Sequence, residues 1–481
     1  MSSDGQLAQL SMTDVASLIA DGEVSPVEVT RNAVDRLERY GDLLGVTTSI
    51  LTDRALADAR RAEREIGAGN YRGVLHGVPI GIKDLADVEG AVTTAGSTVF
   101  GDVPAVADAA LVRALKQSGA VIVCKLNCDE FAYHPTGATS QYGASRNPWN
   151  REIVSGGSSG GTGAAVAAGL IYAGLGTDTG GSIRLPSALC GLVGIKPTYG
   201  RVSLEGVRLL SPSFDTPGPM ARNTRDAAVM LQAMADPLTE TVVHEANRMV
   251  HLTEEIDAGL EGLRVGVPSN YFFDGLDSEI ETIVRAAVDA LVMLGGEQVQ
   301  VALPSVESLA AAQLGILTLE AYHNVIEATG GEITQVNRTL QARLQDGMDE
   351  AMRPGETLAM ALGRLRGERD DALASYRRAT GNIDILVAPV LQRHPPRIES
   401  ATSDYQWMPR LTRPFNGSHQ PVVSVPCGWT EDGIPVGMQI VAMKYRERTA
   451  LRVAYAYEQS EYAPERRWPE LAESSPNDGV D

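Results

Sequence analysis

The sequence predicts an α/β protein that forms one large continuous body, and three observations support this prediction. Between residues 74 and 222, short apolar runs alternate with helical stretches, which is typical of α/β proteins. Strand-like runs return at 383–388, 422–425 and 435–441. No internal repeat and no Pro- or Ser-rich linker divides the 481 residues, so we expect a single domain over 1–481, although length alone would suggest about three.

The expected elements follow in chain order. Residues 1–70 have apolar residues at helical spacing, and Ser25-Pro26 supplies an N-cap and a first-turn proline, so this region is predicted to be helical. The segment 73–222 is predicted to form the core. A connecting stretch over 236–262 precedes a strand at 264–268, and the region 236–380 is predicted to be helical and to lie on the substrate side. The polar tail 467–481 is expected to be flexible. Core strands are expected at 78–82, 121–123 and 174–177, and helices at 107–117, 162–172, 278–294, 307–327 and 357–380.

Composition and charge limit the function classes. With 43% hydrophobic and 21% charged residues the chain is expected to be globular. It shows no membrane-span run and no signal-peptide pattern, so we expect a cytoplasmic protein that does not contact a membrane. The net charge of -20 would repel phosphate backbones, so nucleic acid is not expected as a partner. The four cysteines are too scattered for a disulfide framework or a zinc site, and neither a metal nor a cofactor is expected.

Two segments are dense in Gly, Ser and Thr, namely 155–163 (SGGSSGGTG) and 176–184 (GTDTGGSIR). Consecutive glycines let successive backbone N–H groups point at one spot, which holds negative charge from a phosphate or an oxyanion. Neither segment has the lysine of a Walker loop, and no GxGxxG followed by an acidic residue occurs, which disfavours phosphate. The flanking strands and helices disfavour a flexible linker. An oxyanion site is therefore the favoured interpretation.

An acyl-transfer site also needs a nucleophile and a base. No GxSxG motif surrounds these serines and the seven histidines are scattered, so a Ser-His-Asp triad is not predicted. Lys83 ends an apolar strand, and burial would lower its pKa enough to let it accept a proton. The alternative is a surface lysine paired with Asp84 or Asp87, which the residues alone would favour.

Five motifs, in order and spacing, resemble the amidase signature family: GVPIGIKDL, GGSSGG, GTDTGGSIR, GxxGxKPTYGRVS and Gly218-Pro219-Met220-Ala221-Arg222. The match is dense over 73–222, returns at 415–429 and is thin across 236–380. The resemblance implies a large, mixed, twisted β-sheet covered by helices on both faces. It also implies a Ser-Ser-Lys triad in which Ser182 is the nucleophile, Ser158 relays its proton and Lys83 is the base.

The resemblance implies further roles around the triad. The backbone N–H groups of Thr179, Gly180, Gly181 and Ser182 would form the oxyanion hole, and a cis peptide bond would join Gly157 to Ser158. Asp178 and Arg184 match positions that brace this loop, and Ser159 is a helper behind the triad. Tyr133 matches a position that lines the acyl pocket. His134 stands where many relatives have glycine, so both residues are pocket candidates, with a surface-loop histidine as the alternative for His134.

The substrate is inferred from departures from the family pattern. In the related glutamyl/aspartyl-tRNA amidotransferase, the A subunit binds glutamine with an acidic residue shortly before the segment matching Phe415–Pro421, and here residues 407–413 contain no acid. We therefore expect an amidase for a small or medium, largely neutral amide, with anilides and carbamates included. Its partner would be a small-molecule amide, with a homodimer as a candidate assembly. The alternatives are a non-catalytic binding module of the same fold and the glutaminase A subunit of a tRNA-dependent amidotransferase.

Overall fold

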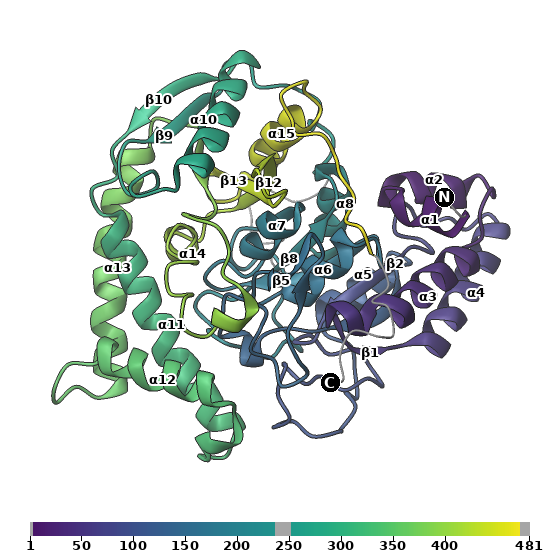
Figure 1. Ribbon diagram of the computed structural model, residues 1–481, viewed down its shortest axis with the longest axis horizontal. Coiled ribbons are helices and arrows are strands. Elements are labelled where there is room, and N and C mark those ends of the chain that lie inside the picture. The colour runs from purple at the N-terminus through teal and green to yellow at the C-terminus, as the bar shows by residue number, and fades with distance from the viewer. Residues whose placement is uncertain (1–2, 236–251, 472–481) are drawn as a thin grey trace, which may run out of the picture.

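The computed structural model describes residues 3–235 and 252–471 (Figure 1). Part of the predicted connecting stretch, 236–251, and most of the predicted flexible tail, 472–481, lie outside the described residues. No helix within the described ranges combines the length and the apolar character needed to cross a bilayer.

One mixed sheet of 11 strands runs through the middle of the molecule, in the order β1-β3-β2-β6-β8-β7-β12-β13-β11-β9-β10. Strand β2 pairs parallel with β3 and β6, whereas β8, β7, β12 and β13 are joined by antiparallel ladders. The predicted large mixed sheet is confirmed. Its strands are β1 (Thr47–Ile50), β2 (Pro79–Lys83), β3 (Val121–Leu126), β6 (Ala173–Asp178), β7 (Val193–Lys196), β8 (Thr216–Ala221), β9 (Arg264–Pro268), β10 (Glu297–Val301), β11 (Ile385–Pro389), β12 (Val422–Trp429) and β13 (Pro435–Ala442), and a separate hairpin consists of β4 (Arg146–Asn147) and β5 (Asn150–Val154).

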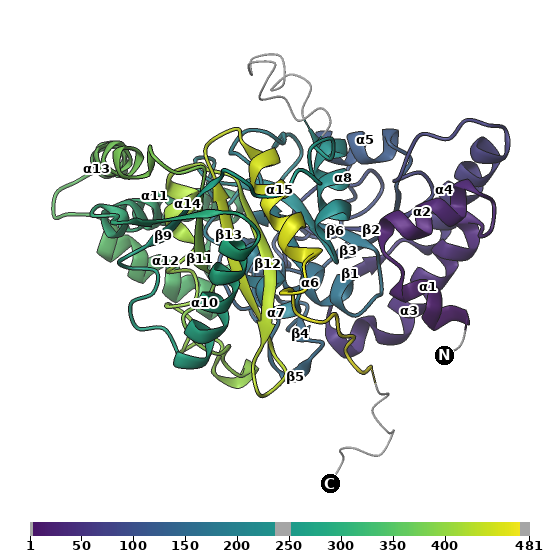
Figure 2. The same ribbon diagram turned by 90° about the horizontal axis from the view of Figure 1, so that it is seen from above.

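Helices cover both faces of the sheet, as predicted (Figure 2). The N-terminal helices lie at one end of the molecule and α11, α12 and α13 at the other (Figure 1). The helices are α1 (Ser3–Gln9), α2 (Met12–Ala20), α3 (Pro26–Leu44), α4 (Thr52–Gly67), α5 (Ala110–Gln117), α6 (Gly160–Ala167), α7 (Arg184–Cys190), α8 (Thr224–Met234), α10 (Ser278–Met293), α11 (Val306–Ala328), α12 (Arg338–Ala351), α13 (Leu358–Thr380), α14 (Arg413–Gly417) and α15 (Glu447–Glu458), with short 3-10 turns at Glu130–Ala132, Ile333–Gln335 and Ile398–Ser400.

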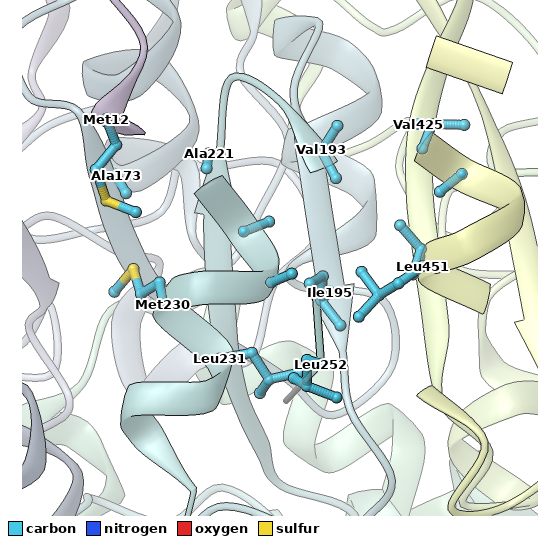
Figure 3. Close-up of a cluster of buried hydrophobic side chains, with 14 of the residues drawn as sticks. Met12, Ala173, Val193, Ile195, Ala221, Met230, Leu231, Leu252, Val425 and Leu451 are labelled. Carbon is cyan, nitrogen blue, oxygen red and sulfur yellow. The ribbon is translucent and has the colours of Figure 1, made fainter. Parts of the chain in front are cut away.

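The core lies between the sheet and its helices. In Figure 3, Val193 and Ile195 of β7 point to the same side as Val425 of β12, where they meet Leu231 of α8 and Leu451 of α15. Because side chains alternate along a strand, Val422 of β12 instead packs in a separate cluster on the other face. Every residue of β2, β3 and β6 is buried. The packing of these strands fixes the position of the ends of β2 and β6, where the candidate site lies.

Several elements were not predicted from the sequence, among them β1, β10 and α12. Strand β1 interrupts the N-terminal helices and pairs antiparallel with β3 at the edge of the sheet. Strand β10 forms the opposite edge, and most of its residues are exposed, so its apolar signal is weak. Helix α12 buries only Leu340, Leu344 and Ala351. A helix with so few apolar positions gives little periodicity in the sequence.

Candidate active site

Lys83 ends strand β2 and is fully buried. Its Nζ lies 2.8 Å from Ser158 Oγ, 2.8 Å from Ser159 Oγ and 2.9 Å from Thr177 Oγ1. Three hydroxyls therefore surround the amine. Thr177, near the end of β6, is a contact that the sequence interpretation missed, because nothing in the motif distinguishes it from a strand threonine.

The alternative in which Lys83 pairs with Asp84 is wrong. The Asp84 carboxylate pairs with buried Lys125 of β3, whose Nζ lies 2.7 Å from its Oδ1. It also accepts a 2.8 Å hydrogen bond from the Thr48 hydroxyl. Lys83 forms no ion pair within the described residues. Burial lowers the pKa of Lys83 to about 8, although Asp129 and other nearby acidic groups oppose this shift. A neutral amine is therefore accessible near physiological pH.

Ser158 precedes helix α6 and follows a cis peptide bond from Gly157, as the resemblance implied. The neighbouring Ser159 hydroxyl donates to the Thr177 carbonyl at 3.3 Å, so its oxygen is left to accept from Lys83. A neutral amine has one lone pair and can accept one hydrogen bond. Since the Ser159 hydrogen is already used, Ser158 is the serine of this pair that can donate to Lys83.

Ser182 lies in the loop between β6 and α7. Ser158 and Ser159 are completely buried, whereas Ser182 keeps 8% of its surface exposed. The Ser182 carbonyl accepts a 3.3 Å hydrogen bond from the Ser159 N–H, which holds the two glycine-serine loops together. Ser182 is thus the serine of the predicted triad that solvent, and hence a substrate, can reach.

Three of the four N–H groups predicted to bind an oxyanion are available in this loop. Within the described residues, the N–H groups of Thr179, Gly180 and Ser182 have no hydrogen-bond partner. The Gly181 N–H instead donates to Asp178 Oδ1 at 2.9 Å, so it is already occupied. Gly181 has φ +138°, and a Cβ here would lie 2.4 Å from Thr412 Oγ1, so only glycine fits.

Asp178 and Arg184 brace the loop through a buried ion pair. Arg184 Nε and Nη2 lie 2.9 and 2.8 Å from the two carboxylate oxygens of Asp178, and Asn416 of α14 donates to the same carboxylate at 2.8 Å. Burial alone would raise the pKa of Asp178, but Arg184 and Asn416 hold it well below its ordinary value. Arg184 also donates to the Thr412 carbonyl at 2.8 Å, which ties the loop to residues 412–416.

A cavity of about 740 Å³ lies beside this loop. Ser182 does not line it, but Arg413 does, and the Arg413 side chain lies against Gly180, where an added Cβ would be 4.0 Å from its Cγ. Most of the wall comes from α11, α12 and α13. The aromatic, hydroxyl and charged side chains of the lining include Tyr133, Thr318, Arg343, Asp346, Glu350, Glu368, Tyr405 and Arg413.

The two predicted pocket residues lie in different places. Tyr133 lines the cavity, and its hydroxyl is 2.7 Å from Thr318 Oγ1 of α11. His134 is buried, and its ring packs against that of Tyr405 at a 47° tilt with centroids 4.1 Å apart, so the surface-loop alternative is wrong. Burial, with a smaller contribution from Arg343, holds the pKa of His134 well below its ordinary value, so the ring is neutral.

Two arginines in the cavity were missed by the sequence interpretation. The Arg343 guanidinium lies 4.5 Å from the Tyr133 ring centroid and 4.9 Å from that of Tyr405. Neither Arg343 nor Arg413 has a side-chain hydrogen bond or ion pair with another described residue, and Nε and Nη1 of Arg343 are buried without a partner. Burial, with a smaller contribution from Arg343, lowers the pKa of Arg413 to about 10, so the Arg413 guanidinium remains charged at neutral pH. No motif marks them, since they lie outside the dense signature segment.

No metal ligands gather at this site within the described residues. The structure does bring Asp277, Glu279 and His394 together at the start of α10, about half-exposed. That group lies outside the triad and the cavity, so it is not part of the candidate active site.

A family model described as Amidase matches residues 28–451. The chain belongs to the amidase family. It is 38% identical to the A subunit of glutamyl-tRNA(Gln) amidotransferase from Myxococcus xanthus, over 94% of this amidase and 97% of that relative.

Solved structures of similar chains agree with the fold. One comes from a vestigial protein complex connected with the origins of an s-triazine catabolic enzyme, with a TM-score of 0.87, 31% identity and coverage of 95% of this amidase and 100% of that chain. Another is the A subunit of glutamyl-tRNA(Gln) amidotransferase from Thermotoga maritima, with a TM-score of 0.81, 26% identity and coverage of 97% and 99%. The amidase is thus an enzyme acting on the C–N bonds of amides.

These relatives correct two predictions. The prediction of a largely neutral amide as substrate is wrong, because relatives at 38% and 34% identity over nearly the whole chain are amidotransferase A subunits. The cavity arginines disagree with it as well. The prediction that partners exclude nucleic acid is also wrong, since the same relatives belong to a glutamyl-tRNA(Gln) amidotransferase. The net charge of one chain is an average, and it does not exclude a nucleic-acid partner.

Proposed function

We propose that this amidase is the amide-hydrolysing A subunit of an amidotransferase. It would release ammonia from a carboxamide whose acyl portion carries a carboxylate, with glutamine as the first candidate, and partner subunits would pass the ammonia to glutamyl-tRNA. The observation that carries the proposal is the pair of unpartnered arginines in the cavity beside the Ser182 loop. The similarity to amidotransferase A subunits supports it, and such a reaction would take place in the cytoplasm.

In the first half of the proposed reaction, Ser182 Oγ attacks the amide carbon. Its proton passes to Ser158 Oγ while the Ser158 proton passes to neutral Lys83 Nζ, which becomes an ammonium group. Because the Ser158 hydroxyl gains one proton as it loses another, no charge is left on it. The carbonyl oxygen becomes an oxyanion that accepts hydrogen bonds from the N–H groups of Thr179, Gly180 and Ser182.

In the second half, the tetrahedral intermediate breaks the C–N bond and Lys83 returns its proton through Ser158 to the leaving nitrogen. Ammonia leaves and the acyl group remains on Ser182 as an ester. Water then attacks the ester, giving its proton to the same relay, and the C–O bond to Ser182 breaks. The carboxylic acid is released and the three residues return to their starting protonation states.

Arg343 is proposed to anchor the substrate. Its guanidinium is held between two aromatic rings while its hydrogen-bond donors stay unused. A planar fork of donors fits a carboxylate. Binding the far end of the acyl chain there would place the amide group toward Ser182.

The test compares ammonia release from L-glutamine by the purified chain alone and by the chain mixed with its partner subunits and glutamyl-tRNA. The proposal predicts glutamine hydrolysis that increases in the complete assembly, and Arg343→Met should raise KM far more than it lowers kcat. A complete assembly that leaves glutamine intact would contradict the proposal.

A further inference from the structure

Four arginines line the acyl pocket. Arg353 and Arg364 pair with acids, whereas Arg343 and Arg413 have no acidic partner among the described residues. Arg343 of α12 and Arg413 at the start of α14 are both half-buried, and Arg343 acts electrostatically on Arg413. Two like charges in a partly dehydrated cavity are unfavourable unless an anion joins them. Proteins rarely keep such an arrangement without a ligand, so the pocket is expected to receive negative charge.

The acids of the cavity lie at its rim. Asp346, Glu350 and Glu368 are exposed, whereas Arg343 is half-buried. Glu368 already pairs with Arg353 at 3.2 Å and with Arg364 at 3.3 Å. An α-ammonium group lies one carbon from its carboxylate, so a carboxylate held between the arginines would bring the ammonium close to two positive charges. Asp346, one helical turn from Arg343, is the nearest acid in sequence that could offset this.

We infer that Arg343 and Arg413 together bind one carboxylate of the acyl chain, and that the pocket therefore favours ω-amides of dicarboxylic acids that lack an α-ammonium group. This inference rests on the proposed function and narrows its substrate class, so that glutamine, its first candidate, is expected to be no better a substrate than the matching amide without the ammonium group. Arg413 would determine specificity, because it lies beside Gly180 of the oxyanion loop and so fixes the distance between the carboxylate and the reacting amide.

A matched set of three amides tests the inference. The monoamide of glutaric acid, L-glutamine and pentanamide share a five-carbon chain with a terminal amide, and differ in the carboxylate and the α-ammonium group. We expect the glutaric monoamide to be hydrolysed with a kcat/KM at least equal to that of glutamine, and pentanamide to be at least about a hundredfold worse, since the arginines would then stay unpaired.

Binding measured by calorimetry on the Ser182→Ala variant separates recognition from catalysis. Adding Arg413→Met to that variant should raise the Kd for the glutaric monoamide about 10- to 100-fold, as for loss of a charge-assisted hydrogen bond. Arg413→Lys should restore part of the affinity. Arg378→Met, which removes an exposed arginine from the far end of α13, is the control and should leave the Kd unchanged.

The outcomes distinguish the inference from the proposed function. If glutamine is more than about tenfold better than the glutaric monoamide and Asp346→Asn abolishes that preference, the inference fails while the proposed function stands. If Arg413→Met folds normally and binds the monoamide as before, the inference fails as well. If neither acidic amide is hydrolysed, or pentanamide is the best substrate, the proposed function fails. The thermal unfolding midpoint of Arg413→Met checks its folding, and it should not fall, because Arg413 has no partner to lose among the described residues.

Discussion

Lys83 combines three features that a lysine base needs. It is fully buried, it contacts hydroxyls instead of carboxylates, and its pKa is lowered to about 8. The neighbouring Asp84 would keep it charged, but Lys125 takes that carboxylate at 2.7 Å. Two lysines on neighbouring strands therefore differ in their surroundings, because Lys125 pairs with a carboxylate and Lys83 contacts hydroxyls.

The pH dependence of turnover follows from this pKa. The protonated amine cannot accept a proton, so kcat/KM should rise about tenfold per pH unit below a midpoint near 8 and level off above it. Lys83→Arg should abolish turnover, since a guanidinium stays protonated at every accessible pH. The measurement is the pH–rate profile of the wild type and the variant.

Lys196 is the matched control for that profile. Burial also lowers its pKa, to about 7, but its Nζ donates to the Pro197 carbonyl at 3.0 Å and touches neither serine of the relay. Lys196→Arg should leave the midpoint where it is. A midpoint that disappears in this variant would assign the titration to Lys196 and contradict the role of Lys83.

A site residue could be predicted from the sequence when it lies in a short recognisable motif, and not when only folding brings it to the site. The triad follows from motifs, because Lys83, Ser158 and Ser182 each lie in a distinctive short segment. Arg343 and Arg413 are 70 positions apart, in segments with no such pattern, and only the packing of α12 against the 405–413 segment brings both to one cavity. The substrate prediction failed at this point, because a pocket assembled from distant segments cannot be seen in sequence order.

At the scale of elements, the catalytic loop depends on the brace between β6, α7 and α14. Arg184 reaches Asp178 with two nitrogens and also donates to Gln439 of β13 at 2.8 Å, so one side chain joins four elements. The Arg184 side chain is fully buried. Its removal is expected to lower the free energy of unfolding, because the Asp178 charge would stay buried without its arginine partner.

Arg184→Met should therefore lower the free energy of unfolding by about 3–5 kcal/mol, measured by urea denaturation. It should also lower kcat with an unchanged pH midpoint, since the loop loses its position while Lys83 keeps its surroundings. Arg393→Met breaks an arginine–aspartate pair that is half-exposed and 2.6 Å long, and should cost less than about 1 kcal/mol. Equal losses in the two variants would refute the brace.

The strands that carry the site could be predicted and the sheet edges could not. The strands β2, β3 and β6 are apolar runs buried along their whole length. By contrast, β10 pairs only with β9 and mostly faces solvent, so its residues Glu297, Gln298 and Gln300 resemble a loop in the sequence. A solvent-exposed edge strand needs few apolar residues, so it lacks the apolar run by which a strand is predicted from sequence.

At the scale of the whole molecule, the signature segment and the variable helices have separate tasks. The sheet and its two glycine-serine loops hold the proposed triad, and α11, α12 and α13 at one end of the molecule form most of the cavity wall (Figure 1). The same reaction can then serve different amides when the helices change. This division explains why amide hydrolysis was predicted correctly while the substrate was not.

The central claim is that Ser182 carries the acyl group during turnover. The most direct measurement is to mix the enzyme with the glutaric monoamide or with L-glutamine, quench in acid within one turnover, and locate the adduct by peptide mass spectrometry. The account predicts one acyl group on the peptide containing Ser182, no adduct in Ser182→Ala, and a turnover rate at least about a thousandfold lower in that variant. An adduct on Ser158, or undiminished turnover by Ser182→Ala, would contradict it.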